Sequence, residues 1–401
     1  MEIGWIDYSR DERNKILSIL SQLGAHEALD ELGIGSVRDA FSDMLFPGIS
    51  VLQTRAKYFL LIPYMFYDAC QKSQSGRLHS GNEVRAYIDK CEDEIVWTLM
   101  NNSGFSTTGI IGSRNYYQNK NVQTKPSAIY WNGLRTMGIL AEPSFSIDNA
   151  CNAIYRKGRL HSKTERKNET EETGADDADI MRDGYIIFNS ISPDYSYIKE
   201  AKINLTTSEA SFLKARILHA DGTKDSALAY LLRNPQLIDK YQSFENFQYN
   251  DFSGDLAENV RLAREFADFI YGAHLLYNII FADGCGFESE LTNRIKEEFE
   301  EYARSYQSPS VDEIITKTNA KYATAKFIRD FDAAMSFSDL DKAQQIVIAR
   351  ELDVKKKRRK LLRPSDYQFT DPIHHFKLSY RWERAKVILQ DIIAGLESNN
   401  G

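Results

Sequence analysis

The sequence of 401 residues predicts a mainly α-helical protein with few short strands. Apolar residues recur at helical spacing along most of the chain, most clearly between Leu256 and Phe281. Strands are few, with a strand-like piece over 185–191, and no repeat of fixed period is present. The composition, 42% hydrophobic and 27% charged, is that of an ordinary globular protein and excludes an intrinsically disordered chain. The length predicts two or three domains.

The N-terminal part is expected to form a helical unit. An apolar stripe from Ile16 to Leu23 predicts a first helix, and a short helix is expected over 36–45. The segment 52–70 is predicted to be a core helix, because its apolar residues occupy nearly every face. Arg55 and Lys57 are expected in the first turn of that helix.

Residues 83–140 have the outline of a winged helix. A helix over 83–100, a glycine- and threonine-rich break, a helix over 126–138 and a short extended stretch follow one another. In a winged helix the second helix can enter the DNA major groove, and Lys125 and Arg135 would then contact nucleic acid. A small three-helix packing unit explains the same pattern equally well.

The segment 161–183 is predicted to divide the chain into two helical portions. It holds eight acids and four bases, with too little apolar surface to offset the entropy of ordering it. We therefore expect an N-terminal α domain over 1–160, a flexible charged loop over 161–183 and a C-terminal helical domain over 184–401. Further helices are predicted over 207–218, 226–232, 256–281, 288–306, 310–334, 338–361 and 378–396.

The cysteines and the apolar runs favour a cytoplasmic protein. The four cysteines are Cys70, Cys91, Cys151 and Cys285, and no two of them form a CxxC pair, so reduced thiols are expected. The longest apolar run, Tyr58 to Tyr67, is about half of the ~20 residues that a membrane span needs, so no membrane partner is expected. No cofactor and no metal site is predicted.

The strongest charged feature is a basic segment over 351–386. It holds eleven Lys and Arg residues against five acids, a net charge of +6 in a chain whose total is −7. Such a segment favours phosphate binding through counterion release, although a solvated face or a docking surface for an acidic partner explains it equally well. The residues expected to hold phosphate are Lys355, Lys356, Lys357, Arg358, Arg359, Lys360 and Arg363, with Lys125 and Arg135 as secondary contacts. The nearby aromatic residues that could stack on bases are Tyr367, Phe369, Tyr380 and Trp382.

A magnesium-dependent nuclease of the PD-(D/E)xK type is the enzyme alternative. Asp194, Glu200 and Lys202 fit the letters of this motif, in which two carboxylates bind Mg²⁺ and a lysine lies beside the attacking water. The interval between these residues is shorter than such cores use, and no α/β sheet is predicted around them.

The block LGIGSVRDAFSDMLFPGISVLQTRAKYFLLIPYMFYD, Leu32 to Asp68, is a specific family signature. Together with the start IGWIDYS, the segments LTTSEASFL and YGAHLLYN and the ending LSYRWERAKVILQDIIAGL, it resembles the bacterial domain-of-unknown-function family numbered 6361 over essentially the whole chain. The resemblance implies no established activity, cofactor or site residue. It implies gene neighbourhoods of the bacterial defence type, with helicases and phospholipase-D-like nucleases as partners.

These observations favour a non-enzymatic subunit that binds DNA or RNA or acts as an adaptor in a bacterial defence-type system, with a helicase or nuclease as a partner protein. The magnesium-dependent nuclease stays open as the enzyme alternative. A third hypothesis is a protein-binding scaffold without nucleic acid, in which the acidic loop 161–183 and the basic segment 351–386 contact partner proteins.

Overall fold

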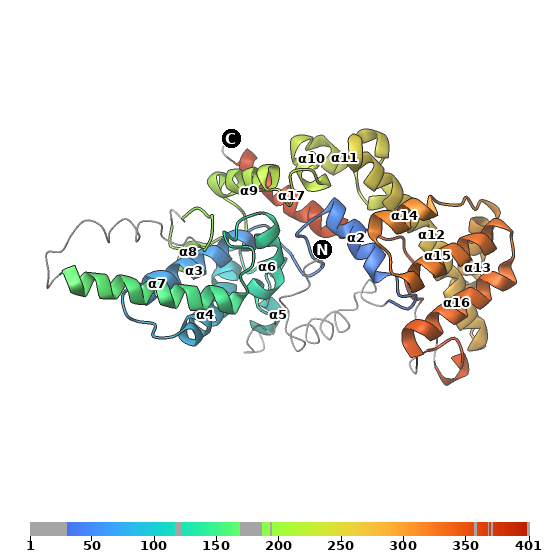
Figure 1. The fold of residues 1–401 in the computed structure, drawn as a ribbon, viewed down its shortest axis with the longest axis horizontal. Helices are drawn as coiled ribbons and strands as arrows, with labels where there is room; N and C mark the ends of the chain where they lie inside the picture. Colours follow the sequence, from blue (N-terminus) through green and yellow to red (C-terminus); the bar gives the residue numbers. More distant parts are fainter. Residues whose placement is uncertain are drawn as a thin grey trace. The chain divides into compact units, whose positions relative to one another are not determined.

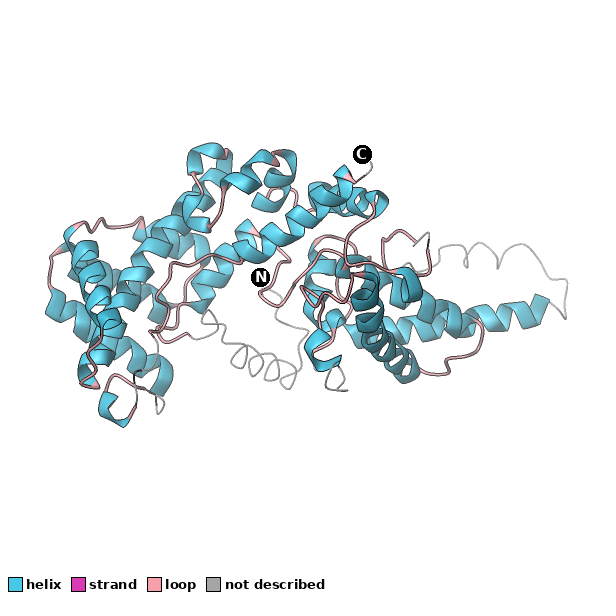
Figure 2. Ribbon diagram, turned by 180° about the vertical axis from the view of Figure 1, so that it is seen from behind, coloured by secondary structure: helices cyan, strands magenta, loops and turns pink. Residues whose placement is uncertain are grey.

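The computed structural model describes residues 30–116, 122, 124–168, 187–192, 195–356, 359–367, 369 and 372–398. Within these residues the protein is mainly helical, as the sequence predicted (Figure 2). The β structure of the described residues is a single antiparallel bridge between Leu140 and Phe188. A wing needs a β-hairpin, so the winged-helix element is not confirmed. No helix of the described residues has the length and apolar character needed to cross a bilayer.

The chain divides into two compact units, and each unit is built from separate stretches of sequence (Figure 1). Unit 1 contains Phe46–Lys240 and Glu383–Gly401. Unit 2 contains the described residues up to Leu45 together with Tyr241–Trp382. Helix α7 (Ile147–Asn168) continues into the segment that was predicted to be a flexible loop, and residues 169–186 lie outside the described part.

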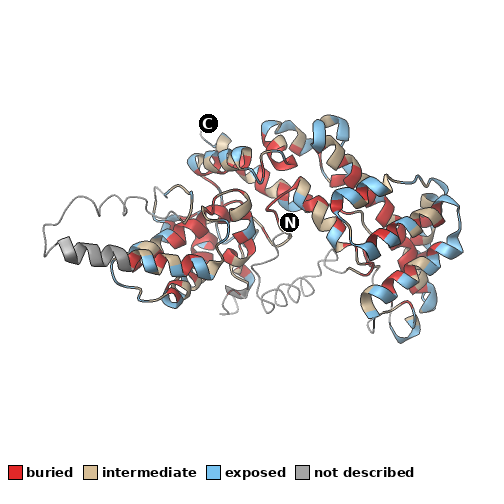
Figure 3. Cartoon of the chain, in the orientation of Figure 1, coloured by how far each residue is buried: buried red, intermediate tan, exposed pale blue. Residues whose placement is uncertain are grey.

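Unit 1 is organised around α3 (Tyr58–Gln74), which packs against α4, α6 and α7. Its first nine residues are all buried, from Tyr58 to Phe66, which explains why apolar residues cover nearly every face (Figure 3). Arg55 and Lys57 precede this helix instead of lying in its first turn. The other helices of unit 1 are α4 (Gly81–Asn102), α5 (Ser113–Tyr116), α6 (Pro126–Thr136), α7, α8 (Tyr197–Glu200), α9 (Thr207–His219), α10 (Ala227–Arg233), α11 (Gln236–Lys240) and α17 (Trp382–Glu397), whose first residue belongs to unit 2.

Unit 2 is organised around α12 (Gly254–Gly284), which contains the helix predicted over 256–281. It packs against α2, α13, α14 and α16, and its inward residues form the core of the unit. The other helices are α2 (Gly35–Leu45), α13 (Glu290–Arg304), α14 (Val311–Thr318), α15 (Tyr322–Ser336) and α16 (Leu340–Lys355), with 3-10 turns η2 (Phe244–Asn246), η3 (Tyr249–Asp251) and η5 (Pro364–Asp366).

The single helix predicted over 310–334 is wrong, because the chain forms α14 and α15 there. Asn319 follows α14 with φ +48°, in the left-handed region. Asparagine tolerates this conformation better than most residues, so it ends a helix without glycine or proline. The helix predicted over 338–361 ends at Lys355, where Lys356 also has a positive φ of 50°.

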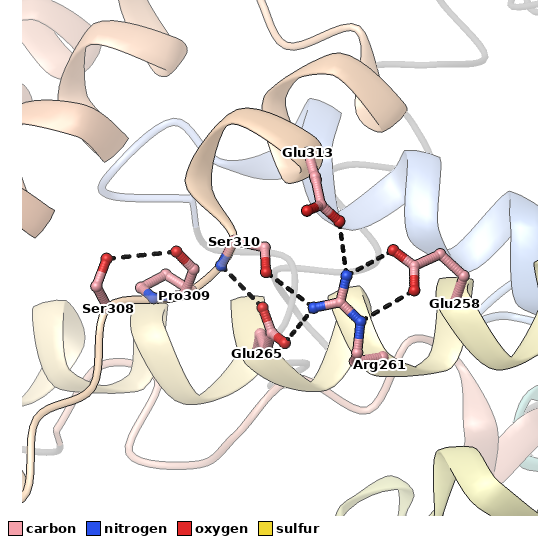
Figure 4. Close-up of polar contacts among 7 residues, drawn as sticks. All are labelled: Glu258, Arg261, Glu265, Ser308, Pro309, Ser310 and Glu313. Atoms are coloured by element: carbon pink, nitrogen blue, oxygen red, sulfur yellow. Dashed lines mark hydrogen bonds and ion pairs between the residues drawn. The ribbon is translucent and has the colours of Figure 1, made fainter.

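Arg261 fastens the start of α14 to α12 in unit 2 (Figure 4). Its five N–H groups donate to Glu258 through Nε (2.9 Å) and Nη2 (2.5 Å), to Glu265 (2.6 Å) and Ser310 Oγ (2.8 Å) through Nη1, and to Glu313 through Nη2 (2.6 Å). This guanidinium lowers the pKa of the Glu258 carboxyl. The cluster therefore has a structural role.

Candidate functional site

The basic segment of unit 2 is partly neutralised by a buried carboxylate. Glu31 is 4% exposed, and it pairs with Lys355 Nζ at 2.8 Å and with Lys360 Nζ at 3.6 Å. Lys360 also lies over the ring of Phe281, with its Nζ 5.7 Å from the ring centroid. Both lysines are thereby held against the core of unit 2.

A second buried carboxylate, Glu351, fixes the backbone of this segment. Its side chain accepts hydrogen bonds from Lys360 N (2.9 Å), Leu361 N (2.8 Å) and Tyr277 Oη (2.8 Å). Burial and the nearby carboxylates raise the pKa of Tyr277, which therefore stays a hydrogen-bond donor. Glu351 therefore holds the backbone of the turn after α16 in place.

Further basic residues of the segment pair with acids that lie elsewhere in the sequence of unit 2. Arg381 pairs with Asp43 at 2.7 Å and with Asp39 at 3.5 Å, and Lys377 pairs with Asp268 at 2.7 Å. These acids lie outside 351–386, so the net charge of +6 counted along the sequence overstates the charge of the surface.

Three of the residues predicted to hold phosphate have no ion pair to a described residue. Lys356 and Arg363 are exposed, while Arg359 Nη1 donates to the Lys356 carbonyl at 3.3 Å. Lys357 and Arg358 lie outside the described residues. A phosphate-binding role for the segment stays a prediction.

The aromatic residues that were expected to stack on bases are mostly core residues. Phe369, Tyr380 and Trp382 are buried, and only Tyr367 is exposed. Tyr380 Oη donates to the Ala263 carbonyl at 2.7 Å, which ties the ring to α12. The expectation of four stacking surfaces is therefore wrong, because these rings fill the core of unit 2.

Lys125 and Arg135 are engaged within unit 1. Lys125 Nζ pairs with Asp93 at 2.7 Å, and Arg135 donates to the backbone oxygens of Pro143 (2.6 Å) and Phe145 (3.2 Å). These contacts hold α6 to α4 and to the chain after α6. A nucleic-acid role for either residue stays a prediction.

The residues of the nuclease alternative are only partly described. Asp194 lies outside the described residues, Glu200 is the last residue of α8, and Lys202 follows it. No cluster of three His, Cys, Asp or Glu side chains in the described residues could hold a metal ion. The proposed catalytic arrangement of Asp194, Glu200 and Lys202 stays a prediction.

Unit 1 contains a polar cavity of about 260 Å³ that sequence reasoning missed. Three stretches of the chain line it: the segment before α3, the end of α4 with the loop that follows, and the link between α8 and α9. Its lining residues are Arg55, Asn102, Ser103, Ser106, Thr108, Lys202, Ile203 and Asn204. Two of them are cations and none is an acid, and Glu200 does not line it.

Arg55 is held in the cavity wall by Asp391 of α17. Its Nε is 2.9 Å from both carboxylate oxygens, its Nη2 is 2.8 Å from Oδ1, and Ala56 N donates to Oδ2 at 2.8 Å. Nη2 also donates to Asn204 Oδ1 at 3.0 Å, while Nη1 makes no hydrogen bond to a described residue. The guanidinium is thus rigid and keeps donor capacity for a ligand.

Tyr130 fixes the backbone on which Arg55 stands. Its Oη accepts from Thr54 N (2.8 Å) and Arg55 N (3.0 Å) and donates to the Arg55 carbonyl (2.9 Å). Burial raises the pKa of Tyr130 to about 12, so the hydroxyl keeps its proton near neutral pH. Arg55 is therefore positioned through its backbone as well as its side chain.

The loop after α4 is tied to both neighbouring stretches. The side-chain amide of Asn102 donates to the carbonyls of Lys199 and Ala201, each at 3.0 Å, and Thr54 Oγ1 donates to the Gly109 carbonyl at 2.7 Å. Gly109 has φ +72°, and a Cβ there would lie 2.7 Å from Arg55 Cγ, so only glycine fits. The cavity is consequently a preformed feature of unit 1.

A buried ion pair fixes the start of α9, next in the chain to the link that lines the cavity. Lys57 Nζ lies 2.7 and 2.5 Å from the two oxygens of Glu209, and both side chains are almost completely buried. Glu209 also accepts from Tyr195 Oη at 2.7 Å and from Thr206 N at 2.8 Å, the latter as part of a capping box. This arrangement sets the position of the link that carries Lys202 and Asn204.

Among the described residues, the cavity has one positive charge that no carboxylate pairs with. Asp391 balances Arg55, whereas Lys202 is exposed and has no ion pair to a described residue. Arg55 lies within the family signature block and Lys202 within the letters of the nuclease motif, but no spacing along the chain connects the two cations.

Residues 1–152 match the model of a family of unknown function, DUF6361, which confirms the family resemblance for this part of the chain. The matched residues include Arg55 and the loop after α4, whereas Lys202 lies beyond them. No curated protein and no solved structure matches the chain.

Proposed function

We propose that the protein is a non-enzymatic nucleic-acid-binding protein, and that the cavity of unit 1 holds a backbone phosphate. The observation that carries the proposal is a fixed arginine and a lysine without an ion pair in one cavity whose described lining contains no acid. Arginine binds phosphate through its planar fork of N–H donors, and lysine binds it as a point charge, so the two together suit a phosphate group. Ser103, Ser106 and Thr108 add hydroxyl donors to the wall.

The size of the cavity favours part of a polymer over a large organic ligand. A volume of about 260 Å³ lies below the roughly 300–1,000 Å³ of sites for drug-sized molecules. One phosphate and its sugar fit this space, and the rest of a strand would continue over the surface of unit 1. Lys199, whose carbonyl is bound by Asn102, is exposed and has no ion pair to a described residue, so it is available to a neighbouring phosphate.

The test is a salt series of single-stranded DNA binding measured by fluorescence anisotropy. Each phosphate contact contributes about −0.7 to the slope of log K against log salt for a single strand. Lys202→Ala is expected to make the slope shallower by about 0.7 and to weaken binding roughly fivefold at about 0.1 M salt. Lys356→Ala removes a matched exposed lysine of unit 2 and is expected to leave both values close to wild type.

Two outcomes would contradict the proposal. An unchanged slope in Lys202→Ala would exclude the cavity as a phosphate site. Absence of any salt-dependent binding by the wild-type chain, to DNA or to RNA, would exclude the proposed function and favour the protein-binding scaffold. Service as an adaptor in a bacterial defence-type system is part of the same proposal, and co-purification with partner proteins from the native host tests it.

A further inference from the structure

Phe105 lies in the loop that lines the cavity, and it is mostly exposed. It lies in the chain between Ser103 and Ser106, which both line the cavity, and its exposed fraction is 63%. A phenylalanine side chain is normally placed where it can bury its ring, since that burial contributes much of its stabilising effect. Single exposed hydrophobic residues are ordinary on protein surfaces, so what distinguishes Phe105 is the cavity-lining loop that contains it.

The backbone that presents this ring is defined by the end of α4. Phe105 N donates to the Met100 carbonyl at 2.8 Å, the bond from the second residue past the cap that is typical of a Schellman motif. Gly104 has φ +62°, as that motif requires. Phe105 itself has φ +59°, which is rare for a bulky residue and costs backbone energy.

The ring is only partly covered at a position where this motif usually provides a hydrophobic contact. In a Schellman motif the residue at the position of Phe105 commonly packs back against the last turn of the helix, whereas this ring stays mostly in solvent. Ser106 N donates to the Ser103 carbonyl at 3.2 Å and Thr108 N donates to Ser106 Oγ at 3.3 Å, so the loop around the ring is hydrogen-bonded. The hydrogen-bonded turn therefore carries an exposed aromatic ring in the same loop that supplies Ser103 and Ser106 to the cavity wall.

We propose that Phe105 is a stacking platform for an unpaired base, so that the cavity and this ring together bind single-stranded nucleic acid. The inference rests on the proposed function, because the cavity must hold the phosphate of the strand whose base stacks on Phe105. A phosphate site with an adjacent aromatic face is the combination by which proteins bind single strands without reading their sequence. Duplex DNA does not offer a base face to this ring, since its bases are stacked on one another.

The experiment compares three probes: a thymidine oligonucleotide, a strand of the same length in which abasic sites replace the bases, and a duplex. The wild-type chain is expected to bind the oligonucleotide best, because only that probe offers both phosphates and free bases. Phe105→Ala and Phe105→Gly are expected to bind the oligonucleotide roughly 5- to 150-fold more weakly and the abasic strand as wild type does. Glycine accepts the positive φ without strain, so a loss shared by both variants reports the ring and not the turn.

A matched variant and a spectroscopic probe complete the test. Phe337→Ala removes a ring of unit 2 that is 84% exposed, and binding is expected to be unchanged. Phe105→Trp is expected to retain affinity, and its added fluorescence is expected to be quenched by the oligonucleotide but not by the abasic strand. Equal binding of these two strands by wild type, with no effect of Phe105→Ala, would overturn the stacking role while leaving phosphate binding intact. Absence of salt-dependent binding by the wild-type chain would instead overturn the proposed function itself.

Discussion

The basic segment of unit 2 and the cavity of unit 1 differ in how far ion pairs reduce their charge. In the segment Lys355, Lys360, Lys377 and Arg381 each pair with a carboxylate of unit 2, whereas Lys356, Arg359 and Arg363 have no ion pair to a described residue. The cavity has only two cations, and one of them, Lys202, has no ion pair to a described residue. The comparison shows that the sequence gives only the number of charged side chains, whereas binding depends on which of them the fold leaves without an ion pair.

The largest expected effect tests whether the basic segment is structural. Glu351→Ala removes the acceptor of three hydrogen bonds and leaves Lys360 N, Leu361 N and Tyr277 Oη without it. We expect a loss of about 4 kcal/mol in the free energy of unfolding, measured in urea, because each buried group left unsatisfied costs roughly 1–3 kcal/mol. A loss below about 1 kcal/mol would mean that the turn after α16 does not depend on this carboxylate.

The stability of unit 1 is expected to depend on pH through the buried carboxyl of Glu92. Glu92 is completely buried, and burial raises its pKa from 4.5 to about 7, although its Oε1 accepts from Ser127 N at 2.5 Å. Because the pKa of Glu92 is higher in the folded state than in the unfolded chain, the protonated carboxyl stabilises the fold fully below pH 4.5. This stabilisation, about 3 kcal/mol in total, is lost as the pH rises from 4.5 through about 7. Glu92→Gln is expected to abolish this loss, as followed by hydrogen exchange of α6. The same pH dependence in the variant would assign it to another group.

Removal of Glu31 tests the pairing and the binding role of the segment together. Glu31→Gln leaves Lys355 and Lys360 without their partner, and we expect the free energy of unfolding to fall by about 2 kcal/mol. The freed lysines are expected to leave single-stranded DNA affinity close to that of wild type, in the anisotropy assay described above. A clear gain in affinity would show that the basic segment, and not the cavity, meets the phosphates.

The smallest effect gives unit 2 a pH signature of the opposite sign. His274 and His374 are buried and stacked, with ring centroids 4.6 Å apart, and burial followed by the neighbouring His374 lowers the pKa of His274. Because the pKa of His274 is lower in the folded state than in the unfolded chain, its contribution to the free energy of unfolding is fully present above about pH 6.5. The contribution is lost as the pH falls below that value, by at most about 1.4 kcal/mol per pH unit. His274→Gln is expected to make the free energy of unfolding depend less on pH, as measured by hydrogen exchange of the amides of α12. An unchanged slope would exclude His274 as its source.

The fold was largely accessible from the sequence because helices are local structures. The period of apolar residues predicted α12 and the buried character of α3. The division into α14 and α15 was missed because Asn319 ends a helix through its left-handed backbone, a property that many asparagines do not use. The paths by which distant segments join a unit, such as α17 in unit 1, leave no local signal either.

The candidate site was not accessible from the sequence because its residues meet only through tertiary contacts. Arg55 and Asp391 are 336 residues apart, and the cavity also needs the loop after α4 and the link that contains Lys202. Sequence reasoning instead favoured the longest run of cations, whose buried partner Glu31 lies near the opposite end of the chain. Pairing across such distances appears only when the fold is known.

The most direct test is the salt dependence of single-stranded DNA binding in two single-lysine variants. Lys202→Ala and Lys356→Ala each remove one exposed lysine, one from the cavity of unit 1 and one from the basic segment of unit 2. We predict that only Lys202→Ala makes the slope of log K against log salt shallower, by about 0.7. A change of that size in Lys356→Ala, with a wild-type slope in Lys202→Ala, would contradict the cavity as the nucleic-acid site.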